Sequence, residues 1–279
     1  MSGSLGYLDS VVLGVVEGLT EFLPVSSTGH LTVAEKLLGQ QVDNPAVTAF
    51  TAIIQFGAIV ATFLYFRRDI ARLVGAWVRG LVSAPARRDP DYRFAWFVIA
   101  GSLPVAVVGF VAKDLIKGPL RSLWVVAAAL VLWSGVMYVA EGRGRQKYGE
   151  EELTLRAALT IGLVQCLALV PGISRSGATI SAGLLLDYTR VTATRLSFFL
   201  AIPALTGAGL YELKDVDTSV VGWGPLAVGT LVSFAVAYAS IAWLLRFVAH
   251  HPITVFVGYR VVAGVLLALV LAAGVMSAT

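Results

Sequence analysis

Hydrophobic segments close to membrane-spanning length make up much of the chain. A helix rises about 1.5 Å per residue, so roughly 20 apolar residues cross the ~30 Å hydrocarbon core of a bilayer. Six uncharged segments approach this length, and they are residues 46–66, 94–112, 122–140, 196–211, 219–245 and 261–279. The pattern therefore predicts six full transmembrane helices.

Two further apolar regions are interrupted by proline and glycine. They are residues 10–38, broken at Pro24 and Gly29, and residues 157–187, broken at Pro171, Gly172 and Gly177. Each is long enough for two half-helices joined by a turn, which enter and leave the membrane on the same side. We therefore expect two re-entrant helical hairpins, in which protein or a polar cavity satisfies the backbone of each turn.

The two interrupted regions resemble each other. Residues 13–19 and 22–27 match residues 161–167 and 169–174, with one residue dropped, and residues 65–69 are echoed by 211–215. An offset near half the chain indicates a duplicated unit of one hairpin and three spans. Because three is odd, the second copy is inverted in the membrane, and such repeats place a binding site at their interface.

We thus predict an all-α polytopic membrane protein with an inverted-topology repeat. It forms a single integral membrane domain over residues 1–279, with repeat one at about 8–141 and repeat two at about 155–279. Composition agrees, because 57% of the residues are hydrophobic and 14% are charged, against about 45–50% and 25% in soluble domains.

The basic residues predict the orientation of the bundle. Of the 21 Lys and Arg residues, 14 fall on one face, in residues 67–93, 143–156 and 190–195 and at Arg246. Four fall on the other face, and they are Lys113, Lys117, Arg121 and Lys214. The positive-inside rule makes the richer face cytoplasmic, so both termini lie outside. Because membrane topology explains the positive residues that give the net charge of +4, we expect no nucleic-acid partner.

Ionisable residues inside apolar segments cost free energy and mark functional sites. The first hairpin contains Glu17, Glu21 and His30. The two carboxylates are four residues apart and share one face of a helix, which suits acid–base chemistry or a divalent cation, Mg²⁺ or Ca²⁺. The alternative is that both are solvated near the membrane surface.

Hydroxyl residues follow the first break. Ser26, Ser27 and Thr28 precede His30, and a half-helix that starts here aims its free backbone N–H groups into the break, as in a phosphate site. Ser27 with His30 supplies a nucleophile and an acid or base. For Ser26 and Thr28, plain helix capping is an equal alternative.

The second break places an arginine among small residues. Arg175 has no acid nearby in sequence, and its planar guanidinium suits phosphate oxygens. Its neighbours are Ser174, Ser176, Gly177 and Thr179. The alternative is a structural ion pair with Glu17 or Glu21. Arg260 is either a second phosphate contact or a side chain that snorkels to the membrane surface, and we favour snorkelling. Gln55 either reaches the site or hydrogen-bonds between helices.

Residues 17–30 and 171–180 resemble the two signatures of the undecaprenyl pyrophosphate phosphatase family, the bacitracin-resistance membrane proteins. The resemblance covers essentially the whole chain. It implies a plasma-membrane hydrolase with an outward-facing site that removes one phosphate from the C55 isoprenyl diphosphate and so regenerates the lipid carrier of peptidoglycan synthesis. It also implies a catalytic set of Glu17, Glu21, Ser27, His30 and Arg175, with Thr28, Ser174, Ser176 and Thr179 at further motif positions.

The mechanism we expect is attack by Ser27 on the terminal phosphoryl group, whose charge Arg175 and the half-helix N-termini hold. Direct attack by water is the alternative. His30 activates the serine or protonates the leaving phosphate, and Glu17 and Glu21 hold the cation or orient His30. The expected substrate-binding set is Ser26, Thr28, Ser174, Ser176, Gly177, Thr179 and Gln55. We expect no organic cofactor.

A transporter or translocase for a lipid phosphate carrier is the alternative function, because inverted repeats with broken helices are typical of transporters. Two breaks rich in Ser and Thr favour the hydrolase. The expected partners are a polyprenyl diphosphate lipid and the bilayer, and a homo-oligomer is left open.

Overall fold

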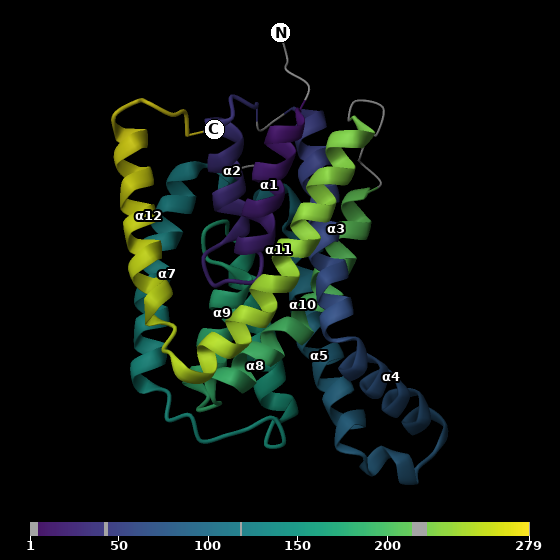
Figure 1. Cartoon of the computed structure of the whole chain (residues 1–279). Helices are drawn as coiled ribbons and strands as arrows, with labels where there is room; N and C mark the ends of the chain where they lie inside the picture. Colours follow the sequence, from purple (N-terminus) through teal and green to yellow (C-terminus); the bar gives the residue numbers. More distant parts are fainter. Residues whose placement is uncertain (1–4, 42–43, 118, 214–221, 279) are drawn as a thin grey trace.

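The computed structural model describes residues 5–41, 44–117, 119–213 and 222–278. Within these residues every regular element is a helix (Figure 1). The longer helices are α1 (Tyr7–Thr20), α2 (Ser27–Leu37), α3 (Pro45–Tyr65), α4 (Arg67–Val82), α5 (Pro90–Val111), α7 (Leu123–Arg143), α8 (Leu155–Gln165), α9 (Arg175–Leu185), α10 (Arg190–Leu213), α11 (Trp223–His250) and α12 (Thr254–Ala272). The short ones are η1 (Pro85–Arg88), α6 (Lys113–Lys117), η2 (Pro119–Arg121) and η3 (Cys166–Leu169).

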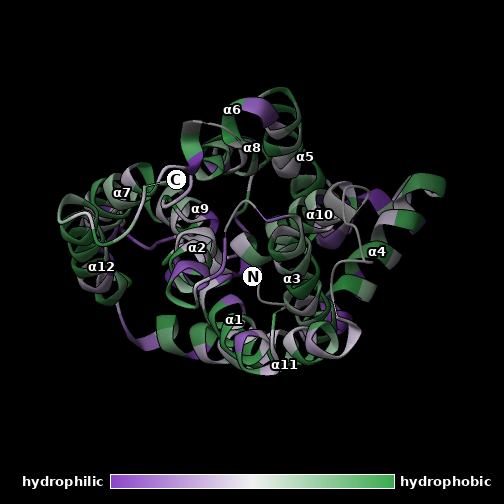
Figure 2. Cartoon of the chain, turned by 90° about the horizontal axis from the view of Figure 1, so that it is seen from above, coloured by the Kyte–Doolittle hydropathy of each residue, from purple (hydrophilic) through white to green (hydrophobic). Residues whose placement is uncertain are grey.

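Six of these helices are long and apolar enough to cross a membrane. They are α3, α5, α7, α10, α11 and α12, which confirms the predicted number of spans. Hydrophobic residues make up much of the outer helices in the view from above (Figure 2), and large apolar side chains such as Leu132 of α7 and Val262 of α12 are exposed.

Several predicted span boundaries were wrong, among them the starts of two helices and the end of α12, which is Ala272 instead of residue 279. The last span starts at Thr254 instead of residue 261 and includes Arg260, because this arginine finds partners inside the protein. Helix α10 starts at Arg190 instead of residue 196, because Arg190 is paired with Glu141. The predicted start at residue 219, Lys214 and part of the echo at 211–215 lie outside the described residues.

Two pairs of short helices enter the bundle from opposite ends. Helices α1 and α2 come from the end where the N-terminus lies and α8 and α9 from the other, and the two connecting turns approach each other at mid-height (Figure 1). Helix α1 has 14 residues and α2 has 11, or about 21 Å and 17 Å. Neither is long enough to cross the hydrocarbon core alone.

The breaks lie before the second helix of each pair. Two glycines that were predicted to interrupt the helices lie inside them instead. Gly29 lies inside α2 and Gly177 inside α9. A Cβ on Gly29 would lie 2.7 Å from a methyl group of Val126 in α7. At this position the glycine provides space for a neighbouring helix and leaves the helical backbone intact.

Small residues let the short helices pack closely against long ones. A Cβ on Gly14 of α1 would lie 2.6 Å from the carbonyl oxygen of Gly229 in α11, and one on Gly162 of α8 would overlap the carbonyl of Gly101 in α5. In an apolar solvent such close backbone contact supplies van der Waals energy that burial from water does not. Each hairpin is thereby fixed against a long helix.

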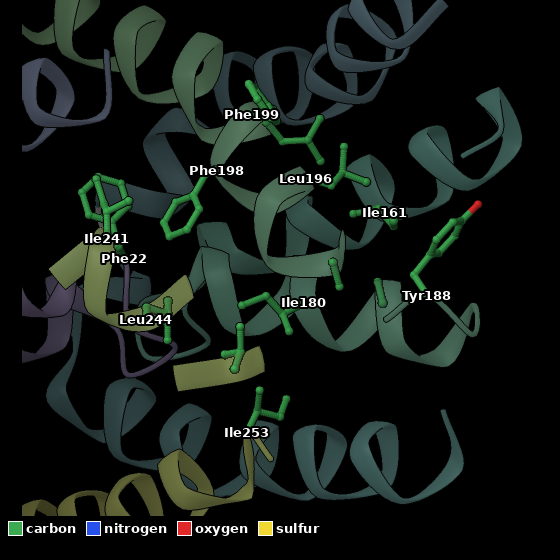
Figure 3. Packing of buried hydrophobic residues seen from close by; sticks show 14 of the residues in the cluster. Phe22, Ile161, Ile180, Tyr188, Leu196, Phe198, Phe199, Ile241, Leu244 and Ile253 are labelled. Atoms are coloured by element: carbon green, nitrogen blue, oxygen red, sulfur yellow. The ribbon is translucent and has the colours of Figure 1, made fainter. Parts of the chain in front are cut away.

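The turn of the first hairpin also belongs to the main hydrophobic cluster. Phe22 is fully buried and meets Phe198 of α10 edge to face, with ring centroids 5.5 Å apart (Figure 3). The cluster continues through Ile180 of α9 to Leu244 of α11 and Ile253. This packing fixes the height at which the first turn stops inside the bundle.

The basic segment 67–93 is more ordered than a connecting loop. It contains the helix α4, which follows α3 and packs against the start of α5. Arg72 is paired with Asp69 and Asp91, so part of the arginine excess is neutralised within the segment. Charge counting along the sequence did not predict this helix.

Candidate active site

Two serines with the same unusual backbone start the second helix of each hairpin. Ser26 caps α2 with φ 79°, and Ser174 caps α9 with φ 77°. A positive φ is costly for a residue with a side chain. When the two hairpins are aligned by their caps, Ser26 corresponds to Ser174, 148 residues later. The first helical residues, Ser27 and Arg175, then occupy equivalent positions. The sequence match had paired Ser27 with Ser174, one position away.

The two turns are hydrogen-bonded to each other. The backbone N–H of Gly172 donates to Ser26 Oγ at 3.1 Å, and Ser176 Oγ donates to the Leu23 carbonyl at 3.0 Å. Both bonds join residues about 150 positions apart in sequence. The structure thus brings the two predicted motifs together in one place.

Ser27, Glu21 and Arg175 form the chemical centre of this contact. Ser27 Oγ donates to Glu21 Oε2 at 2.6 Å, and Arg175 Nη2 lies 3.7 Å from Glu21 Oε1. The side chains of Glu21 and Arg175 are only 5% and 12% exposed, so water screens the pair weakly. The sequence left open whether Glu17 or Glu21 pairs with Arg175, and in the structure the partner is Glu21.

Arg175 keeps one donor free. Its Nη1 donates to the Ser197 carbonyl at 3.0 Å, whereas its Nε is buried and has no hydrogen-bond partner. A buried donor without an acceptor costs free energy, and an anion bound beside Arg175 would remove that cost.

Glu17 lies one helical turn before Glu21. Its side chain is buried, and its Oε1 has no hydrogen-bond partner. An isolated buried carboxylate is costly, which favours a bound proton or a cation. Among the described residues no group of three or more His, Cys, Asp or Glu side chains is arranged to hold a metal ion.

His30 is engaged away from Ser27. Its Nδ1 lies 2.7 Å from the Ser26 carbonyl oxygen and its Nε2 lies 2.6 Å from the Tyr259 hydroxyl. Because a carbonyl only accepts, Nδ1 carries the hydrogen, and in the neutral ring Nε2 accepts from Tyr259. The partner of the Ser27 hydroxyl is therefore Glu21.

Of the remaining predicted residues, some form hydrogen bonds within the second hairpin, and others lie away from the centre of the site. Ser174 Oγ accepts from the Gly177 N–H at 3.2 Å, and Thr179 Oγ1 donates to the Arg175 carbonyl at 2.9 Å. Thr28 is exposed. Gln55 is half-buried in α3, and no hydrogen bond among the described residues joins it to the hairpins.

The interpretation of Arg260 as a snorkelling side chain was wrong. Arg260 is fully buried and donates to the carbonyls of Pro24 and Gly172, one in each turn, at 3.1 and 3.0 Å. It reaches inward because the turn carbonyls have no water to bind in an apolar interior.

Comparison with known proteins identifies the family of the chain. The family model described as bacitracin resistance protein BacA matches residues 10–266. The chain belongs to this family. It is 56% identical over 99% of its length to undecaprenyl-diphosphatase 3 of Frankia casuarinae, covering 100% of that protein. It is 59% identical over 96% of its length to undecaprenyl-diphosphatase 1 of Streptomyces avermitilis, covering 97% of that protein.

The BacA family and the six apolar helices make the chain a multi-pass membrane protein. Three residues next to the BacA-type motifs were not predicted as site residues, namely Ser197, Tyr259 and Arg260. For Arg260 a signal was present, because it is an ionisable residue in an apolar stretch, as are Glu17 and Glu21. Ser197 and Tyr259 carry no such signal.

The unequal pairing of the two carboxylates predicts that their substitutions differ in their effect on stability. Glu21→Gln leaves Arg175 buried without its counter-ion, so the free energy of unfolding should fall by about 1–3 kcal/mol. Glu17→Gln removes a poorly partnered buried charge, so stability should stay unchanged or rise. Thermal unfolding of the purified full chain in one detergent with EDTA measures both. A larger loss in Glu17→Gln than in Glu21→Gln would contradict the pairing.

Proposed function

We propose that the chain hydrolyses undecaprenyl diphosphate to undecaprenyl phosphate and inorganic phosphate. The relatives named undecaprenyl-diphosphatase support this substrate. The observation that carries the proposal is the hydrogen bond from Ser27 to Glu21 beside Arg175. A hydroxyl on a carboxylate, next to a guanidinium with a free donor, suits phosphoryl transfer, and a translocation site has no use for the activated hydroxyl.

Glu21 is the base that activates Ser27 in this proposal. Ser27 Oγ attacks the terminal phosphorus, and its proton passes to Glu21 Oε2 along the hydrogen bond that already joins them. The bond between the terminal phosphorus and the bridging oxygen breaks, and undecaprenyl phosphate leaves with that oxygen. The proton on Glu21 leaves with the undecaprenyl phosphate oxygen, so the carboxylate is free to act as a base again. Water then attacks the phosphoserine and gives its proton to Glu21, which returns a proton to Ser27 Oγ as inorganic phosphate leaves.

Positioning and charge stabilisation provide most of the catalysis in phosphoryl transfer. Arg175 holds the oxygens of the terminal phosphoryl group through Nε, the donor that lacks a partner. The N-termini of α2 and α9 begin at Ser27 and Arg175, and their backbone N–H groups add positive potential where negative charge develops. His30 positions Ser27 through the carbonyl of Ser26.

A divalent cation, Mg²⁺ or Ca²⁺, fits the donor chemistry of Glu17 and Glu21, because Glu17 Oε1 is a buried oxygen without a partner. Such a cation would neutralise charge on the diphosphate and complete its ligand set with phosphate and water oxygens. Ser26, Thr28, Ser174, Ser176, Gly177 and Thr179 complete the proposed lining or its support, and Gln55 remains a proposed contact.

The two helix pairs are the proposed re-entrant hairpins of an inverted repeat in the plasma membrane. Their opposite entry (Figure 1) and their serine caps with equal φ support this arrangement. The charge distribution supports a cytoplasmic α4 and an external N-terminus, so that the site opens toward the outer leaflet.

The proposal is tested by phosphate release from a polyprenyl diphosphate by the purified full chain in detergent. Ser27→Ala should lower kcat more than about 1,000-fold, whereas Ser176→Ala, which removes a hydroxyl that bonds the Leu23 carbonyl and Ser174 Oγ, should lose less than about 20-fold. Acid quench of the wild type should trap phosphoserine at Ser27. No release by the wild type would overturn the hydrolase, and a Ser27→Ala enzyme with a tenth of the wild-type rate would leave direct attack by water.

The proposed orientation is tested by cysteine labelling. In a Cys166→Ser background, Gln41→Cys and Arg88→Cys place exposed thiols at opposite ends of the bundle. An impermeant maleimide added to spheroplasts should label position 41 at once and position 88 only after lysis. The reverse pattern would reject the orientation.

A further inference from the structure

Arg260 of α12 is the largest fully buried side chain in the described part of the chain. Besides the carbonyls of Pro24 and Gly172, it donates to the Ala129 carbonyl at 3.4 Å and to Ser134 Oγ at 3.2 Å, both in α7. One guanidinium therefore joins α7, α12 and both turns.

All four acceptors of Arg260 are uncharged. No salt bridge among the described residues includes Arg260. A cation that is buried without a counter-ion costs free energy, and a simple stabilising contact would not need one. The acceptors explain the choice of arginine, because its planar fork donates to several carbonyls at fixed angles.

The second turn has little freedom at the point where Arg260 binds. Gly172 has φ 99°, and a Cβ there would lie 2.6 Å from the Val126 carbonyl of α7. The N–H of the same residue donates to Ser26 Oγ. Gly172 is thus held by Arg260 through its carbonyl and by the first turn through its amide.

We propose that Arg260 is a positioning residue of the diphosphatase site, which sets the distance between the two turns and so places Ser27 opposite Arg175. The hydrogen bonds of Arg260 go to backbone carbonyls and Ser134, so it acts through the backbone. The residue it holds in the first turn, Pro24, lies three positions before Ser27, and Gly172 lies three before Arg175. This inference rests on the proposed hydrolase function.

Geometry distinguishes positioning from a contribution of charge alone. Lysine keeps the charge but carries its donors on one atom, which does not reach all four acceptors with the geometry of the fork. A misplacement of reacting groups by about 1 Å costs on the order of 100-fold in rate. Arg260→Lys should therefore lower kcat at least about 30-fold and change KM less than about 3-fold.

The experiment measures phosphate release from a polyprenyl diphosphate by the full-length protein in detergent, with thermal unfolding of each variant alongside. Arg195→Lys is the matched control, because Arg195 pairs with Glu150 and Asp69 outside the site; it should keep wild-type kcat. If Arg260→Lys does not purify folded, Ser134→Ala replaces it, since loss of one anchor should lower kcat about 3- to 10-fold.

A double-mutant cycle with Ser26→Ala supplies a readout that a merely structural role would not move. Ser26 and Arg260 hold the same two turns. Once Arg260→Lys has released the turns, Ser26→Ala should therefore lower kcat little further. In the Arg195→Lys background, Ser26→Ala should lower kcat by the same factor as in the wild type. Wild-type kcat in Arg260→Lys, or full additivity with Ser26→Ala, overturns the inference. Absence of phosphate release by the wild type overturns the proposed function instead, and the same cycle on unfolding temperature then decides whether Arg260 joins the turns.

Discussion

The structure depends on how two backbone turns are satisfied deep inside an apolar bundle. Much of each turn is buried in the protein, Val25 and Ser26 in the first and Ser174 in the second, so the buried N–H and C=O groups need partners from the protein. The partners come from the opposite turn and from α12: Ser26 accepts from Gly172, Ser176 donates to Leu23, and Arg260 donates to the carbonyls of Pro24 and Gly172. Satisfying the backbone therefore brings the two halves of the chain together.

The same constraint concentrates chemical groups. Each turn ends in a serine cap with positive φ, and the next residue, Ser27 in one hairpin and Arg175 in the other, starts a helix at the contact. The proposed nucleophile and the proposed anion-binding guanidinium thus occupy equivalent positions of two similar hairpins. Glu21 lies between them, bonded to the Ser27 hydroxyl and paired with Arg175. Helix N-termini add positive potential at the same place, so the contacts that satisfy the backbone of the turns also assemble the proposed phosphate site.

The sequence predicted the parts of this structure that depend on hydropathy and on local breaks. Six spans follow from apolar length, and Pro24 and Pro171 locate the two turns. Partners between distant segments were not predictable, because periodicity fixes only which face of a helix a residue occupies. Tyr259 beside His30 and Arg260 between the turns are of this kind. Gly29 and Gly177 were wrongly interpreted as helix breaks. Gly29 makes room for α7 and Gly177 for the cap Ser174, and in sequence such a glycine cannot be distinguished from one that ends a helix. Helix α4 was missed because its arginines indicated a loop.

The central claim is that both turns build one phosphate site, with Ser27 and Arg175 on the same anion. An experimental structure of the full chain with orthovanadate, a mimic of the transferring phosphoryl group, tests it most directly. Vanadium should be bonded to Ser27 Oγ, with the Arg175 guanidinium donating to the vanadate oxygens and with both turns unmoved. Vanadate that contacts only one hairpin, or that lies away from Ser27 and Arg175, would contradict it.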